Sequence, residues 1–273
     1  MTIIPQALDL TTIKQRQQTM WASGDFGVIA SLIHIVAERL VDSADLIAGS
    51  RVLDVAGGTG NAAIAAARCG CDVTCTDYVP ALLERGRARA RAERLNIEFA
   101  EADAEALPCA DGEYDAVLSV FGSMFAPDQP RAASELVRVA RPGGIIALAS
   151  WTPDGFLGEL FRATAAHVPP PPGVASPLRW GTEAGITELL GDEVEFVSTR
   201  RRTFTWRFRR AAEMIYTLRE WYGPTVKAFE AVGPAGAAAL ERDLIAVVER
   251  AARARHGAIA VPAEYLEVVA VKR

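Results

Sequence analysis

The fold is decided by one stretch of the sequence, Arg51-Val52-Leu53-Asp54-Val55-Ala56-Gly57-Gly58-Thr59-Gly60-Asn61. It joins a short apolar run that contains one carboxylate to three glycines within four positions, and an alanine-rich segment follows. This order predicts a strand, a tight loop and a helix. Glycines let the loop approach a ligand closely, and the first turn of the helix directs unpaired N–H groups toward it. The stretch therefore predicts a binding loop for a small molecule.

Two classes of ligand fit this loop. Residues 58–63 satisfy the G-x-G-x-x-[GA] fingerprint of dinucleotide-binding folds. Asp54 favours a different ligand, because a carboxylate beside the glycines repels a pyrophosphate and attracts a cationic amino acid. S-adenosylmethionine (SAM) carries an ammonium and a sulfonium but no phosphate. The stretch resembles motif I, [DE]-x-G-x-G-x-G, of the class I SAM-dependent methyltransferases, with Ala56 in place of the first glycine.

Three later segments extend the resemblance in the expected order. Asp77 ends a predicted strand 17 residues after Gly60 (77 − 60 = 17), where adenosine-binding folds place a ribose-binding carboxylate. Residues 103–108 resemble the family's D-A-x-x-L-P segment, which implies that Asp103 and Ala104 lie at the adenine. Residues 135–144 resemble the helix-to-strand passage of the ubiquinone- and menaquinone-biosynthesis-like methyltransferases (methyltransferase type 11).

The resemblance implies an α/β fold, a Rossmann-like doubly wound sheet of seven strands in the order 3-2-1-4-5-7-6, with strand 7 antiparallel and with helical cap insertions. We expect an N-terminal helical lid at 1–48 and a SAM-binding core at 49–152. Residues 153–273 then complete the same domain, with a helical cap insertion at about 211–257 and a terminal strand at 264–272. In the segment 194–208, alternation places Phe204, Trp206 and Phe208 on one face, which we expect to be buried.

The expected cofactor is SAM, with S-adenosylhomocysteine as the product. Ligands of open α/β sheets bind beyond the carboxyl ends of the strands, so the loop after the strand 114–120 should border the donor and the acceptor. The cofactor-binding residues predicted from the motifs and from this rule are Asp54, Ala56, Gly57, Gly58, Gly60, Asn61, Asp77, Tyr78, Asp103, Ala104, Ser119 and Phe121. The arginines of the next helix, at 85, 87, 89, 91 and 94, are interpreted as a solvated face.

Composition limits the partners and the compartment. The chain has 273 residues, a formal net charge of −5 and no apolar run of about 18 residues. This argues against nucleic acid as the main partner and against a membrane span, and we expect a cytoplasmic protein. The crowded cysteines Cys69, Cys71 and Cys75 lack the paired spacing of a zinc site, so no metal is expected. The oligomeric state stays open.

A small, apolar or aromatic acceptor is expected, because aromatic residues gather in segments outside the minimal fold. The predicted substrate-binding residues are Trp21, Phe26, Met124, Phe125, Trp151, Trp180 and Tyr222. Core packing is the competing interpretation for each of them. Methyl transfer is an in-line displacement that depends mainly on alignment, so the catalytic residues are unknown, and His167 and Tyr222 are the candidates for a base. Two other functions remain open: an NAD(P)-dependent oxidoreductase and a catalytically silent SAM-binding protein.

Overall fold

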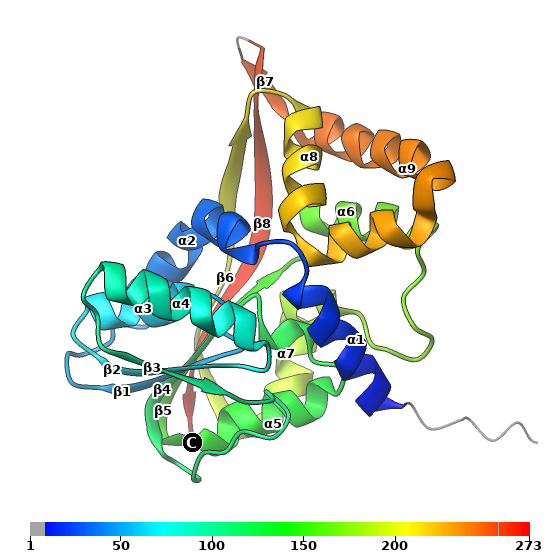
Figure 1. Ribbon diagram of the computed structural model, residues 1–273. Coiled ribbons are helices and arrows are strands. Elements are labelled where there is room, and N and C mark those ends of the chain that lie inside the picture. The colour runs from blue at the N-terminus through cyan, green and yellow to red at the C-terminus, as the bar shows by residue number, and fades with distance from the viewer. Residues whose placement is uncertain (1–8, 256) are drawn as a thin grey trace, which may run out of the picture.

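The computed structural model describes residues 9–255 and 257–273, and within them one mixed sheet organises the chain (Figure 1). Its order is β3-β2-β1-β4-β5-β8-β6, with β7 paired to β8. The strands are β1 (Arg51–Val55), β2 (Asp72–Asp77), β3 (Ile97–Glu101), β4 (Tyr114–Val120), β5 (Ala140–Trp151), β6 (Val194–Phe208), β7 (Arg253–Arg255) and β8 (Ala258–Lys272). The predicted order and the antiparallel strand are confirmed, with β8 in the place of the expected strand 7. The short β7 makes eight strands where seven were predicted.

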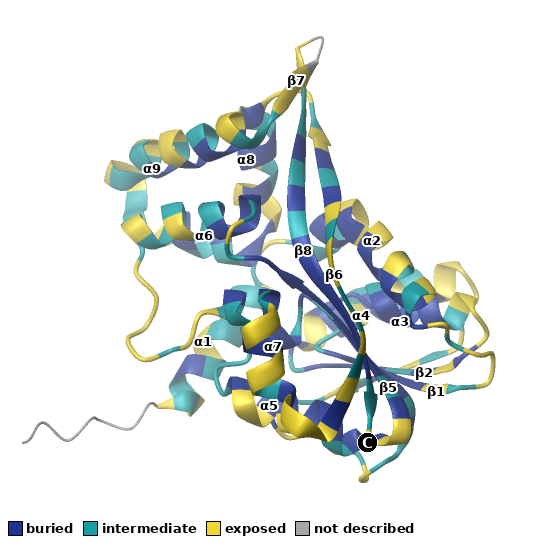
Figure 2. Cartoon of the chain, turned by 180° about the vertical axis from the view of Figure 1, so that it is seen from behind, coloured by how far each residue is buried: buried dark blue, intermediate teal, exposed yellow. Residues whose placement is uncertain are grey.

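Helices cover both faces of the sheet. Helices α2 (Phe26–Ser43), α3 (Asn61–Arg68) and α4 (Pro80–Ala92) lie on one face, and α5 (Gln129–Val139) and α7 (Glu183–Leu190) lie on the other (Figures 1 and 2). The short helices η1 (Ser123–Phe125), η2 (Pro177–Gly181) and η3 (Gly191–Glu193) lie in connections. This two-sided cover explains why β1 is buried at every position after Arg51.

The remaining helices extend beyond this layered core. They are α1 (Leu10–Ala22), α6 (Phe156–His167), α8 (Ala211–Trp221) and α9 (Gly223–Ala251). Helix α9 is kinked at Gly233, just before Pro234. The described part of the chain has no single helix with the length and hydropathy of a membrane span. Helices α1 and α2 have the length and hydropathy of a span only when taken together, and they are bent by 90° relative to each other.

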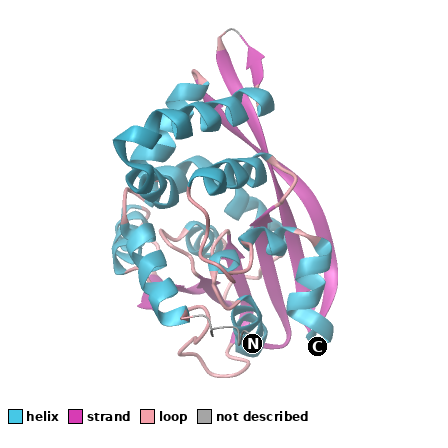
Figure 3. Ribbon diagram, turned by 90° about the vertical axis from the view of Figure 1, so that its right-hand side faces the viewer, coloured by secondary structure: helices cyan, strands magenta, loops and turns pink. Residues whose placement is uncertain are grey.

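A long antiparallel pair of strands, β6 and β8, supports these outer helices. Strand β5 pairs with β8 only from Tyr265 onward, whereas β6 pairs with β8 from Ile259 to Lys272. The β6–β8 pair therefore continues past the end of β5, and α6, α8 and α9 lie beside this extension (Figures 1 and 3). The terminal strand begins at Ala258, earlier than the predicted residue 264, and Pro262 lies within it.

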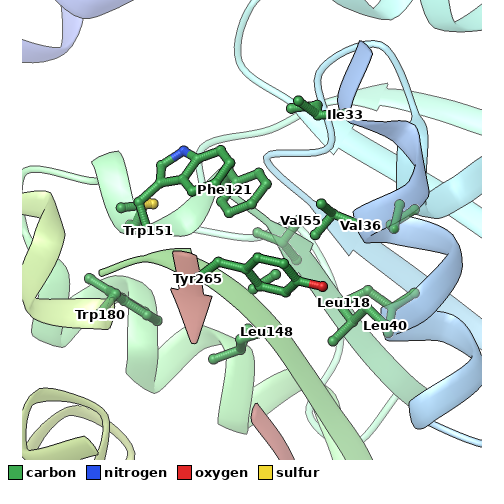
Figure 4. Packing of buried hydrophobic residues seen from close by; sticks show 14 of the residues in the cluster. Ile33, Val36, Leu40, Val55, Leu118, Phe121, Leu148, Trp151, Trp180 and Tyr265 are labelled. Atoms are coloured by element: carbon green, nitrogen blue, oxygen red, sulfur yellow. The ribbon is translucent and has the colours of Figure 1, made fainter. Parts of the chain in front are cut away.

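The apolar core reaches the carboxyl ends of the central strands. Phe121 and Trp151 stack in parallel with their ring centroids 3.6 Å apart, and Tyr265 meets Phe121 edge-on (Figure 4). Leu118 of β4 and Leu40 of α2 are fully buried below them. These packing contacts fix the end of β4 at the same edge of the sheet at which the glycine loop follows β1.

Candidate functional site

The glycine loop between β1 and α3 has the geometry of a ligand cradle. Gly58 has a φ of +57°, a conformation that favours glycine, and its N–H donates to Asp77 Oδ2 at 2.9 Å. A Cβ on Gly122 would lie 2.2 Å from the Ala56 carbonyl oxygen, so the segment after β4 packs directly on the loop. Ala56 itself has a φ of +51°, a left-handed backbone conformation that is strained for alanine and would not be strained for glycine.

Asp54 lies beneath the loop. Its side chain is buried, Oδ2 accepts from the Ala63 N–H at 2.9 Å, and Oδ1 has no hydrogen-bond partner among the described residues. Burial raises the pKa of Asp54 to about 7. Asp54 does not line the cavity above the loop, so it contributes by holding the first turn of α3.

Asp77 stands at the end of β2 and faces the loop from the side. Its carboxylate accepts from the N–H groups of Gly58 and Val79, both at 2.9 Å. Burial raises the pKa of this carboxyl group to about 6. Tyr78 follows on the cavity wall, and its backbone oxygen accepts from Gln18 Nε2 of α1 at 2.5 Å.

Asp103 is paired with a residue that the sequence analysis missed. Lys14 of α1 places its Nζ 2.6 Å from Asp103 Oδ2 and also pairs with the buried Glu105. The other oxygen of Asp103, Oδ1, accepts from the Glu105 N–H at 2.9 Å. Helix α1 therefore contributes the one cationic side chain among the described residues that line the cavity.

Arg89 corrects the interpretation of α4 as a solvated arginine face. Its Nη1 donates to the Thr59 carbonyl oxygen and to Asn61 Oδ1, both at 2.8 Å. Asn61 in turn donates to the Ala30 carbonyl oxygen of α2 at 2.9 Å. Arg89 thus connects α4 to the glycine loop. Arg89 lies seven residues after Leu82 and three after Gly86, which are both buried, and this helical spacing was the available signal.

A cavity of about 860 Å³, including its mouth, opens above the loop. Predicted cofactor residues on its wall are Ala56, Gly57, Gly58, Asn61, Asp77, Tyr78, Asp103, Ala104 and Phe121. Gly60 and Ser119, like Asp54, lie outside the lining. Ser119 instead donates to the Val55 carbonyl oxygen at 2.8 Å and supports the loop from below. Lys14, Gln17, Thr59, Leu82 and Glu105 were not predicted.

A second cavity of about 470 Å³, also including its mouth, adjoins the first. The two share five lining residues, namely Trp21, Phe26, Ile33, Phe121 and Phe125. The second cavity lies between the end of the sheet and the outer helices, and it includes the predicted residues Trp151 and Tyr222. Its other lining residues, such as Trp206 and Met214, were not predicted as site residues, although Trp206 was expected on a buried face.

Three other predicted residues lie elsewhere. Met124 and Trp180 are each 1% exposed and line neither cavity, so the structure places them in the core. Trp180 is enclosed because η2 packs directly on β5, where a Cβ on Gly181 would lie 1.9 Å from the Trp151 carbonyl oxygen. His167 ends α6, and its Nε2 lies 2.7 Å from Asp243 Oδ2 on α9. It lines neither cavity and is in no position to act as a base there.

The described residues contain no group of three or more histidine, cysteine or acidic side chains arranged to hold a metal ion. Cys71 and Cys75 are buried in and beside β2, as small apolar residues would be. That activity needs no metal stays a prediction.

Comparison with known proteins connects this geometry to a family. The chain is 41% identical over 276 residues to the uncharacterized protein Rv1405c of Mycobacterium tuberculosis, with 100% of each chain covered. Among solved structures, a putative methyltransferase from Bacillus halodurans superposes with a TM-score of 0.60 at 18% identity, covering 86% of this chain and 98% of the other. This second likeness shows the fold alone.

The glycine loop itself lies within the region that decides the family. Residues 52–144 match the model of the family described as "Methyltransferase domain". Demethylmenaquinone methyltransferase of Deinococcus radiodurans is 38% identical over 138 residues, covering 48% of this chain and 57% of that protein. The chain belongs to the class I SAM-dependent methyltransferases. In this methyltransferase the matched region holds the loop, Asp77 and Asp103, while α1 and the outer helices lie outside it.

Proposed function

We propose that this methyltransferase transfers the methyl group of SAM to a small, apolar or aromatic acceptor. One observation carries the proposal: the cavity above the glycine loop adjoins a second, apolar cavity, and five side chains border both. A donor bound in the first cavity would reach an acceptor in the second without either being exposed to bulk water. Such enclosure and alignment are what a displacement at a sulfonium requires.

The residues of the first cavity fit the parts of SAM. We assign the ribose hydroxyls to Asp77, whose buried carboxylate can accept from both of them. The adenine fits between Tyr78, Ala104 and Asp103, with the Asp103 carboxylate as acceptor for its amino group. The amino-acid part fits the cradle formed by residues 56–58, where Gly58 and Gly57 allow the closest approach.

In the reaction, the residues of the chain align the donor with the acceptor and enclose both. Bound SAM supplies an activated methyl group on a sulfonium with a good leaving group. Trp21 of α1 and Phe26 of α2 border both cavities, and Trp21 lies 5.7 Å from Tyr222 between ring centroids. We therefore propose that α1 acts as a lid and that α6, α8 and α9 act as a cap over the acceptor.

Calorimetry and turnover test this function separately. The purified chain should bind S-adenosylhomocysteine and should not bind NAD, and NAD binding without S-adenosylhomocysteine binding would overturn the donor assignment. Incubation with methyl-labelled SAM and a panel of apolar, aromatic and charged small molecules should transfer label to one of the first two classes. Donor binding without turnover on any of them would favour the catalytically silent SAM-binding protein.

A further inference from the structure

The second cavity, here called the acceptor chamber, has no charged lining residue within residues 9–255 and 257–273. Its fourteen lining residues are thirteen apolar side chains and Tyr222. Four acidic or basic side chains, by contrast, line the cavity above the glycine loop: Lys14, Asp77, Asp103 and Glu105. The charges of the site are thus confined to the donor end.

A chamber of this kind discriminates strongly by charge. An ionised group leaves its hydration shell to enter, and no opposite charge or row of hydrogen-bond donors replaces the lost water. An uncharged ring loses only hydration that is unfavourable to it. The chamber therefore selects against carboxylate, phosphate and ammonium groups on the part of the acceptor that it encloses.

Two polar groups in the chamber wall have no partner in the described chain. Trp206 is 4% exposed, and its indole Nε1 has no hydrogen-bond partner. Tyr222 is 8% exposed, and its hydroxyl makes no hydrogen bond with the described residues. A buried donor without a partner is unfavourable, and such groups in ligand sites commonly fix the orientation of the ligand. An N–H and an O–H can both donate to one oxygen.

The surrounding walls favour a flat ring. The ring of Trp21 contacts those of Phe26, Phe125 and Tyr222, and the ring of Phe26 also contacts that of Tyr222. The ring centroids of these four pairs are 5.0 to 6.4 Å apart, and none of the pairs is stacked. Aromatic groups attract one another in edge-to-face and offset arrangements, so such walls accept a further ring. Phe121, which also lines the chamber, has a φ of +57°, a strained value of the kind that occurs at functional sites.

We propose that the acceptor chamber binds an uncharged aromatic molecule that carries a hydroxyl or carbonyl oxygen, and that Trp206 and Tyr222 position this oxygen by hydrogen bonds. The proposal rests on the proposed function, because it assigns the substrate class of the same site. Burial raises the pKa of the Tyr222 hydroxyl, so at neutral pH this group stays protonated and acts as a donor rather than as a base.

Three matched bicyclic probes test the proposal. Calorimetry first establishes that the full chain binds S-adenosylhomocysteine, and the loaded protein is then titrated with 5-indanol, indane and indane-5-carboxylate. We expect 5-indanol to bind about ten- to a hundredfold more tightly than indane, because the hydrogen bonds from Trp206 and Tyr222 each provide about three- to tenfold. The carboxylate should bind at least about 100-fold more weakly than 5-indanol because its charge is not compensated.

Conservative variants locate the polar contacts. Trp206→Phe and Tyr222→Phe each remove one donor and keep a ring, so each should lower the affinity for 5-indanol and leave that for indane unchanged. The matched controls are Trp221→Phe and Tyr216→Phe, whose side chains lie on α8, are 39% and 61% exposed, and line neither cavity. Unchanged indane binding also shows that a variant has folded with an intact chamber.

The outcomes separate the two proposals. If S-adenosylhomocysteine does not bind, the proposed function itself fails. If it binds and the carboxylate binds as tightly as 5-indanol, or if none of the three probes binds, the chamber does not select an uncharged aromatic acceptor. If 5-indanol binds equally well to the wild type and to both chamber variants, Trp206 and Tyr222 do not hold its oxygen, and that part of the inference is overturned.

Discussion

Asp77 is the residue on which donor binding should depend most. Its carboxylate is 6% exposed and accepts two backbone N–H groups, which orient it toward the cavity. We expect Asp77→Ala to weaken S-adenosylhomocysteine binding by about 1.5 to 3 kcal/mol, on the order of ten- to a hundredfold, because hydrogen bonds to a charged acceptor are lost. Isothermal titration calorimetry gives the dissociation constants.

Asp72 provides the control for this change. It begins the same strand, β2, with an exposed side chain, so Asp72→Ala should leave the affinity unchanged. Circular dichroism should show that both variants remain folded. An Asp77→Ala protein that binds as tightly as the wild type would place the ribose contact on another residue.

Among the secondary-structure elements, α4 has a role beyond covering the sheet. Arg89 holds the glycine loop through Thr59 and Asn61, and Arg91, two residues later, is exposed and makes no contact with the loop. We expect Arg89→Met to weaken S-adenosylhomocysteine binding by about tenfold, because the loop loses hydrogen bonds from a charged donor. The same measurement on Arg91→Met should give the wild-type value, and equal losses in both variants would point to a general charge effect.

The sequence predicted those elements whose signal is local. The β1 strand, the glycine loop and α3 follow from consecutive residues, and the alternation of Phe204 and Trp206 predicted a buried face of β6. The burial of individual polar side chains could not be predicted from neighbouring residues in the same way. Asp54 faces the backbone of Ala63 rather than the cavity, and Arg89 faces the loop rather than water, because both depend on how α3 and α4 pack on the sheet.

The start of β8 shows a second limit. The predicted terminal strand began at residue 264, and a proline such as Pro262 is unusual inside a strand, since it has no N–H to donate. In the structure β8 pairs with β5 from Tyr265 onward and with β7 only at Ala258–Ala260. Pro262 therefore lies where β8 has β6 as its neighbour on one side alone, and the missing N–H costs no ladder bond. Whether a strand tolerates a proline therefore depends on which strands lie beside it, and these are distant in the sequence.

For the whole molecule, the buried acids predict how stability depends on pH. A carboxyl group whose pKa is higher in the folded chain than in the unfolded chain binds its proton more tightly when folded. Its contribution therefore favours the folded state at low pH and is lost as the pH rises from about 4 to about 7. Asp54, with a pKa raised to about 7 by burial, is the strongest case.

Asp54→Asn tests this effect. The amide cannot ionise but keeps an oxygen that can accept from the Ala63 N–H. The free energy of unfolding of the variant relative to the wild type should rise by about 2 to 3 kcal/mol between pH 5 and pH 8. Urea unfolding at both pH values measures it, and a difference that does not change with pH would mean that Asp54 titrates normally in the folded chain.

Activity of the whole enzyme should not depend on a metal ion. We expect incubation with EDTA, followed by its removal, to leave the rate of methyl transfer unchanged, because alignment and enclosure suffice for this displacement. The assay is run on the acceptor identified by turnover, with untreated enzyme as the control. A rate that falls after chelation and returns with magnesium would instead indicate an acceptor held through a bound cation.

The position of the outer helices on the β6–β8 extension gives the molecule a modular construction. The residues that line the first cavity lie at positions up to Pro127, α1 included, whereas four of the nine residues that border the chamber alone, namely Trp206, Met214, Leu218 and Tyr222, come from the last part of the chain. Protein engineers could therefore exchange α8, α9 and the ends of β6 and β8 that lie beyond β5 as one contiguous segment. Variants with a new acceptor preference could then be selected while the cavity above the glycine loop, where we propose that SAM binds, is left unchanged.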